Sequence, residues 1–201
     1  TGNGQINADH ATLIDDATGT ITVSAGTLSY VKIVEGPSGD GSELDTKSLT
    51  ADQTLTVHAA GYDANDNYLG DQTVTWSSSG LSPAVSGSGT SITFSPTTAP
   101  ASGTITADHA SATDDVTGLI SVSDGVAHHV KVLSGLSGET SEITSSGLTT
   151  GNTLTVHASS FDADDNYIGD VSVSWEVSGA IGTLDNATGV NTTLTATTPG
   201  T

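Results

Sequence analysis

Two acidic turns of the sequence contain the residue types that bind calcium ions. Asp162, Asp164 and Asn166 occupy alternate positions of one turn. The corresponding positions of the other turn are Asp63, Asn65 and Asn67. Carboxylate and amide oxygens favour calcium over zinc, but calcium takes six to eight oxygens, so one turn alone does not complete a site. The alternative is that each turn only satisfies its own backbone hydrogen bonds.

Two acidic loops are the candidates for the remaining calcium ligands. One loop holds Asp9, Asp15 and Asp16, and the other holds Asp108, Asp114 and Asp115. In an immunoglobulin-type sandwich, the loop after the second strand and the loop between the last two strands lie at the same end. We therefore expect a calcium ion between an acidic turn and an acidic loop. For the turn at 162–166, that loop has to come from a neighbouring copy.

The acidic turns lie in two copies of one long repeat. The segment LTVHAAGYDANDNYLGDQTVTW covers residues 55–76, and LTVHASSFDADDNYIGDVSVSW covers residues 154–175, at an offset of 99 residues. Apolar and polar residues alternate on both sides of each turn, which indicates half-buried strands. Weaker strands are expected near 44–49, 83–86 and 91–95. A repeat of this length is a whole domain, so the chain contains two domains in tandem.

The strand pattern predicts an all-β fold. About seven short strands per repeat, with turns between them and no helical period, predict an immunoglobulin-like Greek-key β-sandwich. The turn GYDANDNYLGD, the strand VTW and a later Gly-x-Ile-x-Ala strand resemble the bacterial immunoglobulin-like domains of invasin and intimin-type surface proteins. The resemblance covers nearly all of the chain, twice. It implies two tandem sandwiches in an extracellular, cell-surface protein, for instance the stalk of an adhesin.

The repeat is out of phase with the chain. Residues 1–22 match the strand pair at 103–122, so they form an orphan strand pair, followed by domain 1 at 23–122 and domain 2 at 123–201, which lacks its closing pair. One explanation is an excerpt from a longer periodic protein. This agrees with the absence of methionine and the start at Thr1. The other is strand donation, in which residues 1–22 complete domain 2 of the next identical chain, head to tail.

The composition excludes several classes of function. Three Lys and Arg stand against 23 Asp and Glu, a net charge of −20, so nucleic-acid binding is disfavoured because no basic patch replaces phosphate counterions. Such acidity indicates a halophilic protein, whose surface repulsion salt screens, or carboxylates neutralised by calcium; the two are compatible. The chain has no cysteine, hence no disulfide, and no apolar run long enough to span a membrane.

No motif predicts an enzyme. The sequence has no Gly-x-Ser-x-Gly at a strand–helix junction. His58 and His157 fall on the outward positions of a strand, so we expect them to be exposed and structural. Two N-glycosylation sequons start at Asn186 and Asn191, in a segment expected to be a surface loop.

The leading prediction is therefore a structural protein. It is an immunoglobulin-like spacer or subunit of a surface filament, surface layer or adhesin stalk, whose junctions calcium stiffens. The expected partners are identical chains or repeats. The alternative is a carbohydrate- or ligand-binding module, with Tyr30, Tyr68 and Tyr167 as the candidate aromatic residues.

Overall fold

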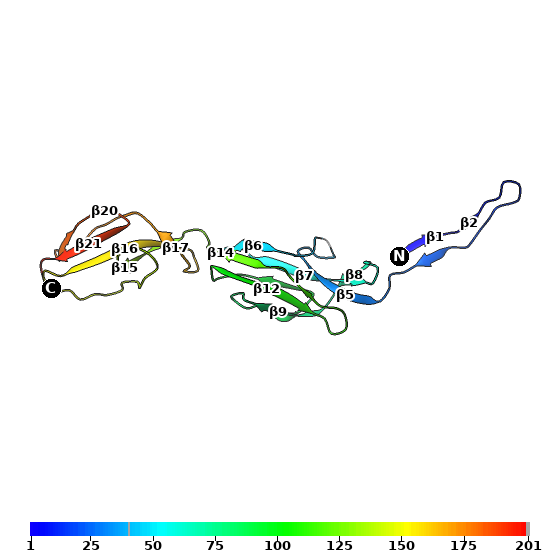
Figure 1. The fold of residues 1–201 in the computed structure, drawn as a ribbon, viewed down its shortest axis with the longest axis horizontal. Helices are drawn as coiled ribbons and strands as arrows, with labels where there is room; N and C mark the ends of the chain where they lie inside the picture. Colours follow the sequence, from blue (N-terminus) through cyan, green and yellow to red (C-terminus); the bar gives the residue numbers. More distant parts are fainter. Residues whose placement is uncertain (40, 200–201) are drawn as a thin grey trace. The chain divides into compact units, whose positions relative to one another are not determined.

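The computed structural model describes residues 1–39 and 41–199 (Figure 1). Every regular element in these two ranges is a β-strand. The all-β prediction is therefore confirmed, and the arrangement of the sheets is sandwich-like. The immunoglobulin-type Greek-key topology stays a prediction. Among the described residues, no helix is long and apolar enough to cross a membrane.

Contacts within the chain divide it into two compact units. Unit 1 comprises residues 1–47, 55–94 and 103–120, and unit 2 comprises residues 48–54, 95–102 and 121–201. The predicted domain boundaries after residues 22 and 122 stay predictions.

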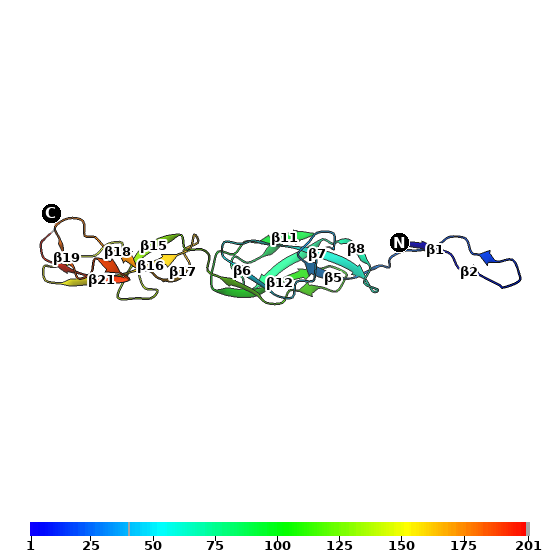
Figure 2. The same cartoon turned by 90° about the horizontal axis from the view of Figure 1, so that it is seen from above.

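Two sheets build the first sandwich-like body. One sheet has the strand order β10-β9-β12-β14-β6, with β13 beside β12, and the other has the order β11-β7-β5, with β8 beside β7. Figure 2 shows β11 and β7 in a different layer from β6 and β12. The strands are β5 (Leu28–Val34), β6 (Lys47–Thr50), β7 (Leu55–Asp63), β8 (Tyr68–Asp71), β9 (Val74–Ser79), β10 (Ser86–Gly89), β11 (Ser91–Phe94), β12 (Ala101–Asp108), β13 (Asp115–Val116) and β14 (Ile120–Ser123).

The alternation of the sequence explains the core of unit 1. Leu55, Val57 and Ala59 are buried along β7, while the residues between them are more exposed. On β9, Trp76 is buried, and its indole Nε1–H donates a hydrogen bond of 3.0 Å to the carbonyl oxygen of Gly89. A buried indole N–H needs such a partner. This bond therefore fixes the ring between the two sheets.

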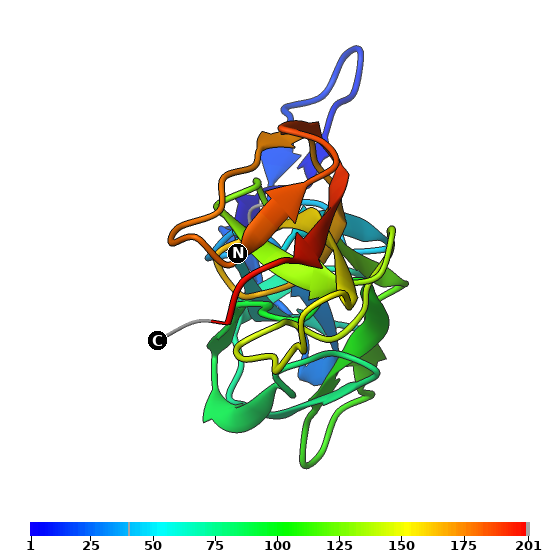
Figure 3. The same ribbon diagram turned by 90° about the vertical axis from the view of Figure 1, so that its left-hand side faces the viewer.

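Unit 2 repeats only part of this arrangement. Its main sheet has the order β15-β16-β21-β19, with β17 beside β16, and β18 pairs with β20. Figure 3 shows β21, in red, near the end of the chain. The strands are β15 (His129–Ser134), β16 (Thr153–Phe161), β17 (Tyr167–Asp170), β18 (Val173–Ser174), β19 (Gly182–Leu184), β20 (Thr188–Gly189) and β21 (Asn191–Ala196).

Two regions that are strands in the first copy are not strands in unit 2. Residues 146–149 correspond to β6 and contain no strand. Residues 175–178 correspond to the second half of β9, and they also contain none. In the first copy, these two elements flank the pair β12 and β14. Unit 2 is therefore irregular at the places where such a pair would lie.

The first 23 residues form a separate β-hairpin. β1 (Gly2–Gly4) pairs with β4 (Ile21–Val23), and β2 (Asn7–Ala8) pairs with β3 (Asp16–Ala17). These pairs are two-stranded sheets with no third strand in the described part of the chain (Figure 1). All of their side chains are exposed. The hairpin thus makes its own hydrogen bonds but has no core.

Candidate functional site: an open groove and an exposed hairpin

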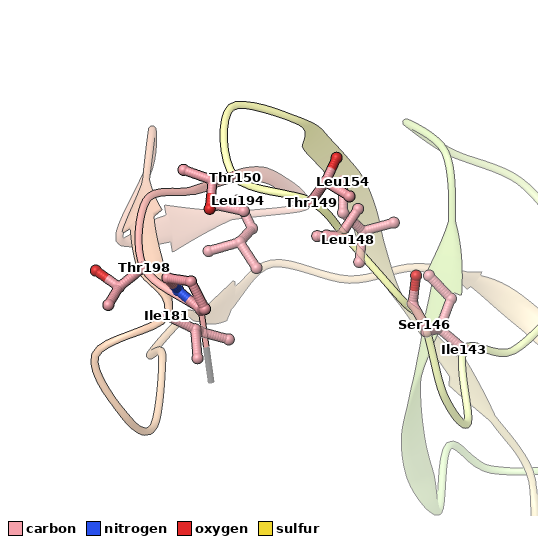
Figure 4. Close-up of a pocket in the computed structure, with 11 residues that line it drawn as sticks. Ile143, Ser146, Leu148, Thr149, Thr150, Leu154, Ile181, Leu194 and Thr198 are labelled. Carbon is pink, nitrogen blue, oxygen red and sulfur yellow. The ribbon is translucent and has the colours of Figure 1, made fainter. Parts of the chain in front are cut away.

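An apolar groove opens on the surface of unit 2. Its volume is about 660 Å³, and Figure 4 shows leucine and isoleucine side chains gathered around it. The lining residues are Ile143, Ser146, Leu148, Thr149, Thr150, Leu154, Ile181, Leu194, Ala196, Thr198 and Pro199. Most of its side chains are aliphatic, so the groove fits an apolar occupant better than a charged one.

The same positions in the first copy are covered. Leu148 and Leu154 of the groove are half-buried, whereas their counterparts Leu49 and Leu55 are only 6% and 4% exposed. Leu194 faces Leu154 across the strand pair β16–β21, as Phe94 faces Leu55 across β7–β11. The groove is thus a core surface whose counterpart is closed.

The strands β12 and β14 supply buried side chains in the first copy. Ile105 and Ala107 of β12 and Ile120 of β14 have no exposed surface, and Val122 is 3% exposed. β12 also pairs along β9, with Ala107 opposite Trp76. In unit 2, Trp175, the counterpart of Trp76, is only half-buried.

The N-terminal hairpin carries the same apolar residues in an exposed state. Ile6, Ile21 and Val23 correspond to Ile105, Ile120 and Val122 of the first copy. They are 67%, 41% and 65% exposed. Isolated exposed apolar residues are normal, but a cluster of them on one ribbon is a candidate interaction surface.

The hairpin already has the local conformation of its buried counterpart. The N–H of Ile6 donates to Thr18 Oγ1 at 3.0 Å, and the N–H of Ile105 donates to Thr117 Oγ1 at 2.9 Å. The registers agree as well, because Ala8 pairs with Asp16 as Ala107 pairs with Asp115. The hairpin therefore needs little reordering in order to pack as β12, β13 and β14 do.

The tips of the two hairpins also agree. Asp15 Oδ1 accepts a hydrogen bond from the N–H of His10 at 2.9 Å, and Asp114 Oδ1 accepts one from the N–H of His109 at 2.7 Å. Each histidine Nδ1 then accepts the N–H groups two and three residues later. These bonds give both loops the same shape.

In unit 1, the acidic loop packs on β5. The N–H of Val31 donates to the carbonyl of Thr113 at 3.0 Å, and the N–H of Ile33 donates to Asp115 Oδ2 at 2.7 Å. Burial raises the pKa of Asp115. Val31 and Ile33 are 2% and 0% exposed.

The corresponding strand of unit 2 lacks this cover. Val130 and Val132, the counterparts of Val31 and Ile33, are 50% and 40% exposed. In the hairpin, the residues that correspond to Thr113 and Asp115 are Ile14 and Asp16, and Ile14 is fully exposed. In the described part of the chain, strand β15 of unit 2 therefore has no acidic loop packed on it, and the acidic loop of the hairpin packs on no strand.

Both acidic turns satisfy their own backbone. Asp63 Oδ1 accepts hydrogen bonds from the N–H groups of Asn65 and Asn67, at 2.9 and 3.0 Å, while Oδ2 accepts one from Gly26. The side-chain amide of Asn67 donates to both oxygens. The bonds from Asn67 and Gly26 hold the pKa of Asp63 well below its usual range. Donors thus already surround this carboxylate, as a self-satisfied turn requires.

The turn of unit 2 is built in the same way. Asp162 accepts hydrogen bonds from the N–H groups of Asp164, Asn166 and Gly125. Burial acts to raise the pKa of Asp162, but these bonds and the one from the Asn166 amide outweigh it, so the pKa is lowered. Left-handed backbone at Asp66 and Asp165, with φ of 63° and 68°, closes both turns.

The predicted calcium ligands do not gather into one cluster. Among the described residues, no group of three or more Asp, Glu, His or Cys side chains is placed to hold a metal ion. Asp9, Asp16, Asp108 and Asp164 are exposed. Calcium binding therefore stays a prediction, and the oxygens that the structure shows in use are acceptors of N–H bonds.

Two other sequence interpretations need correction. His157 is fully buried rather than exposed, because Nε2 lies 2.7 Å from the carbonyl oxygen of Gly138 and Nδ1 lies 3.2 Å from that of Gly135. Asn191 lies in β21 rather than in a loop, and its amide donates to the carbonyl of Leu136 at 3.1 Å. Asn186 is exposed between β19 and β20.

The candidate aromatic residues do not form a flat platform. Tyr30 stacks on Tyr62 at 5.5 Å between ring centroids, and Tyr68 is tilted by 60° against Tyr62. In unit 2, Tyr167 meets Phe161 edge to face. Tyr68 and Tyr167 lie at an angle to the rings that they contact, so the candidate rings do not form one flat surface, and the binding of a carbohydrate or other ligand stays a prediction.

The comparison with known proteins gives no family for this chain. No protein-family model matches it, and no curated protein matches it.

The sequence predicted the hairpin as a possible donor and an open groove in domain 2, but it did not identify the residues that line the groove. Its lining residues are ordinary apolar positions of a core, and only the comparison of the two repeats distinguishes them. The available signal was the identity of Leu49 with Leu148 and of Leu55 with Leu154 in a domain predicted to be incomplete.

Proposed function

We propose that this protein is a structural subunit or spacer of an extracellular filament or stalk. Its copies join head to tail by strand donation. The hairpin 1–23 of one copy, the donor, enters the groove of unit 2 of another copy, the acceptor. Each completed unit is then an immunoglobulin-like sandwich of the bacterial cell-surface type. The donor hairpin takes the places that β12, β13 and β14 occupy in the first copy.

One observation carries the proposal. The same sequence pattern is buried at Ile105, Ile120 and Val122 and exposed at Ile6, Ile21 and Val23. The surface that receives it is covered around Leu55 and open around Leu154. Among the described residues, the hairpin therefore has no surface that covers it, and the groove of unit 2 has no hairpin that fills it. The hairpin and the groove are parts of the same repeat, so the closed first copy is a template for how the hairpin would pack in the groove.

Strand donation also satisfies the backbone. In the first copy, β12 forms backbone pairs with β9 from Thr104 opposite Ser79 to Asp108 opposite Thr75. A donor hairpin offers the same edge to residues 174–178 of the acceptor. Open strand edges are sites of strand addition. We therefore expect β18 to lengthen when the hairpin binds.

The free energy of association between two copies requires contributions from both side chains and backbone. Full burial of an isoleucine or valine stabilises by about 1.5–3 kcal/mol, so Ile6, Ile21 and Val23 contribute about 3–5 kcal/mol at their present exposure. Association costs about 4–15 kcal/mol. The three side chains therefore do not hold a joint alone. The additional burial of Val130 and Val132, together with the new backbone pairs, supplies the remainder.

The test places a charge on the donor ribbon. Ile21→Asp leaves the free chain folded, because Ile21 is exposed, but it buries a carboxylate in the joint, since Ile120 at the same position has no exposed surface. Thr20→Asp is the matched control, because its counterpart Leu119 is 53% exposed. Light scattering and electron microscopy should show filaments for the wild type and Thr20→Asp, and monomers for Ile21→Asp. A wild-type chain that stays monomeric at millimolar concentration refutes the proposal.

A further inference from the structure

A second contact at each joint follows from the way unit 2 holds residues 95–102. Asn166 Oδ1 accepts a hydrogen bond of 2.9 Å from the N–H of Ala99, and Asn166 Nδ2 donates one of 3.2 Å to the carbonyl of Thr97. Asn166 is only 9% exposed. The acidic turn of unit 2 therefore clamps the backbone of a segment that follows β11.

The corresponding turn of unit 1 makes no such contact with the described residues. Asn67, the counterpart of Asn166, is exposed. Its Nδ2 donates only to Asp63, and its Oδ1 accepts no hydrogen bond from the described residues. Beside it is a recess of about 390 Å³, lined by Thr1, Gly2, Val23, Ser24, Ala25, Asp66, Asn67 and Tyr68. Asn166 thus holds a backbone segment in one copy, whereas Asn67 holds none among the described residues.

The counterpart of the clamped segment is exposed as well. Thr197 and Pro199 follow β21 as Thr97 and Ala99 follow β11, because Phe94 and Leu194 occupy the same register against Leu55 and Leu154. Residues 197–199 are exposed. The N–H groups of Thr197 and Thr198 donate to the carbonyl of Ile181, but the carbonyl of Thr197 accepts no hydrogen bond from the described residues. Asn67 and the carbonyl of Thr197 are therefore both accessible for a second contact.

We infer that the recess beside Asn67 of the donor chain binds the Thr197–Pro199 segment of the acceptor chain. This rests on the proposed strand donation and adds a second surface to it. The hairpin of the donor enters the acceptor, and the acceptor segment returns to the acidic turn of the donor. Asn67 Nδ2 donates to the carbonyl of Thr197 in the joint, as Asn166 donates to Thr97. The partner of this recess is thus a second copy of the same chain.

The joint is weaker than the contact inside unit 2. Pro199 stands where Ala99 stands and has no N–H to donate to Asn67 Oδ1. Gly151 stands where Asp52 stands, and Asp52 Oδ2 accepts a hydrogen bond of 2.6 Å from the N–H of Val126. The joint between two copies therefore lacks two of the hydrogen bonds that are present around residues 97–99 and Asp52 in unit 2. Pro199→Ala restores one donor, so we expect association to tighten by about 2–13-fold, the equivalent of 0.5–1.5 kcal/mol.

Engineered cysteine pairs test the contact in the full chain, which has no cysteine of its own. Asn67→Cys with Thr197→Cys should give a ladder of disulfide-linked chains under oxidising conditions. Ser88→Cys with Thr197→Cys is the negative control, because Ser88 lies on β10 and outside the recess. Asn166→Cys with Thr97→Cys is the benchmark, and it should close within one chain.

The outcomes separate this inference from the proposed function. A wild-type chain that does not associate refutes strand donation, and this contact with it. Chains that associate without a 67–197 ladder, while the 97–166 benchmark closes, refute only the contact beside Asn67. If neither pair closes, the Pro199→Ala variant decides: tighter association than wild type supports the contact, and unchanged or weaker association overturns it.

Discussion

Replacement of one isoleucine in each copy separates folding from assembly. Ile6 on the hairpin and Ile105 on β12 are the same residue of the repeat in two environments, 67% and 0% exposed. We predict that Ile105→Ala destabilises the folded chain by about 2–5 kcal/mol, the usual result of deleting a buried isoleucine side chain. Ile6→Ala should leave the stability of the free chain almost unchanged.

The effect of Ile6→Ala should appear in association instead. About two-thirds of the Ile6 side chain becomes buried in the joint, so the loss scales to about 1.3–3.3 kcal/mol. Since 1.4 kcal/mol corresponds to a factor of ten, the Kd of the joint should rise by about 10–250-fold. Sedimentation velocity over a concentration series measures the Kd, and urea unfolding measures the stability of each variant.

A matched control makes the comparison specific. Thr20→Ala also changes the hairpin, but its counterpart Leu119 stays 53% exposed in the closed copy, so the Kd should change by less than about threefold. If Ile6→Ala associates like the wild type, then Ile6 is not buried in the joint and the proposed register of donation is wrong. If Ile6→Ala destabilises the free chain as much as Ile105→Ala does, the hairpin is already packed before assembly.

Three further predictions concern the free chain. Trp76→Phe should cost about 1–3 kcal/mol in urea unfolding because it removes the hydrogen bond that the buried indole donates to the half-buried carbonyl of Gly89. Trp175→Phe should cost less, since Trp175 is half-buried, and equal losses would contradict the open groove. The pKa values of Asp63 and Asp162 are lowered by folding. The stability that their ionised forms contribute is therefore present above the ordinary aspartate pKa of about 4 and is lost as the pH falls through the lowered pKa; Asp63→Asn should show a shallower acid transition by circular dichroism. If the acidic loops bind calcium, excess chelator should lower the Tm, and an unchanged Tm would count against the site.

The strands were predictable because their side chains alternate with period two. The predicted strands around 44–49, 55–59, 74–76 and 91–95 overlap β6, β7, β9 and β11. Alternation assigns a residue to one face of a strand but does not show what covers that face. Alternation therefore predicts that His157 is exposed, because it lies on the face of β16 that points away from the core. In the structure, the carbonyl groups of Gly135 and Gly138 cover this face at His157.

The acidic turns show a second limit of sequence reasoning. The spacing of Asp63, Asn65 and Asn67 is compatible with metal ligands and with a self-bonded turn, because both need oxygens at alternate positions. Only the structure shows which atoms face the Asp63 carboxylate, and these are N–H groups. The role of Asn166 was equally hidden, since its hydrogen-bond partners at Thr97 and Ala99 are backbone groups that any residue type provides.

The proposed strand donation predicts that the acidity of the chain makes association depend on salt. The hairpin 1–23 contains Asp9, Asp15 and Asp16 and neither lysine nor arginine, while residues 123–201 contain a single lysine, Lys131, among their acidic residues. Donor and acceptor therefore repel each other at low ionic strength, which opposes indiscriminate pairing of exposed strand edges. Salt shortens this repulsion to about 8 Å at 0.15 M and about 3 Å at 1 M, while it leaves the burial of Ile6, Ile21 and Val23 favourable. If copies join by strand donation, we therefore expect them to stay apart in dilute buffer and to associate most firmly in concentrated salt, where the matched apolar surfaces determine which edges pair.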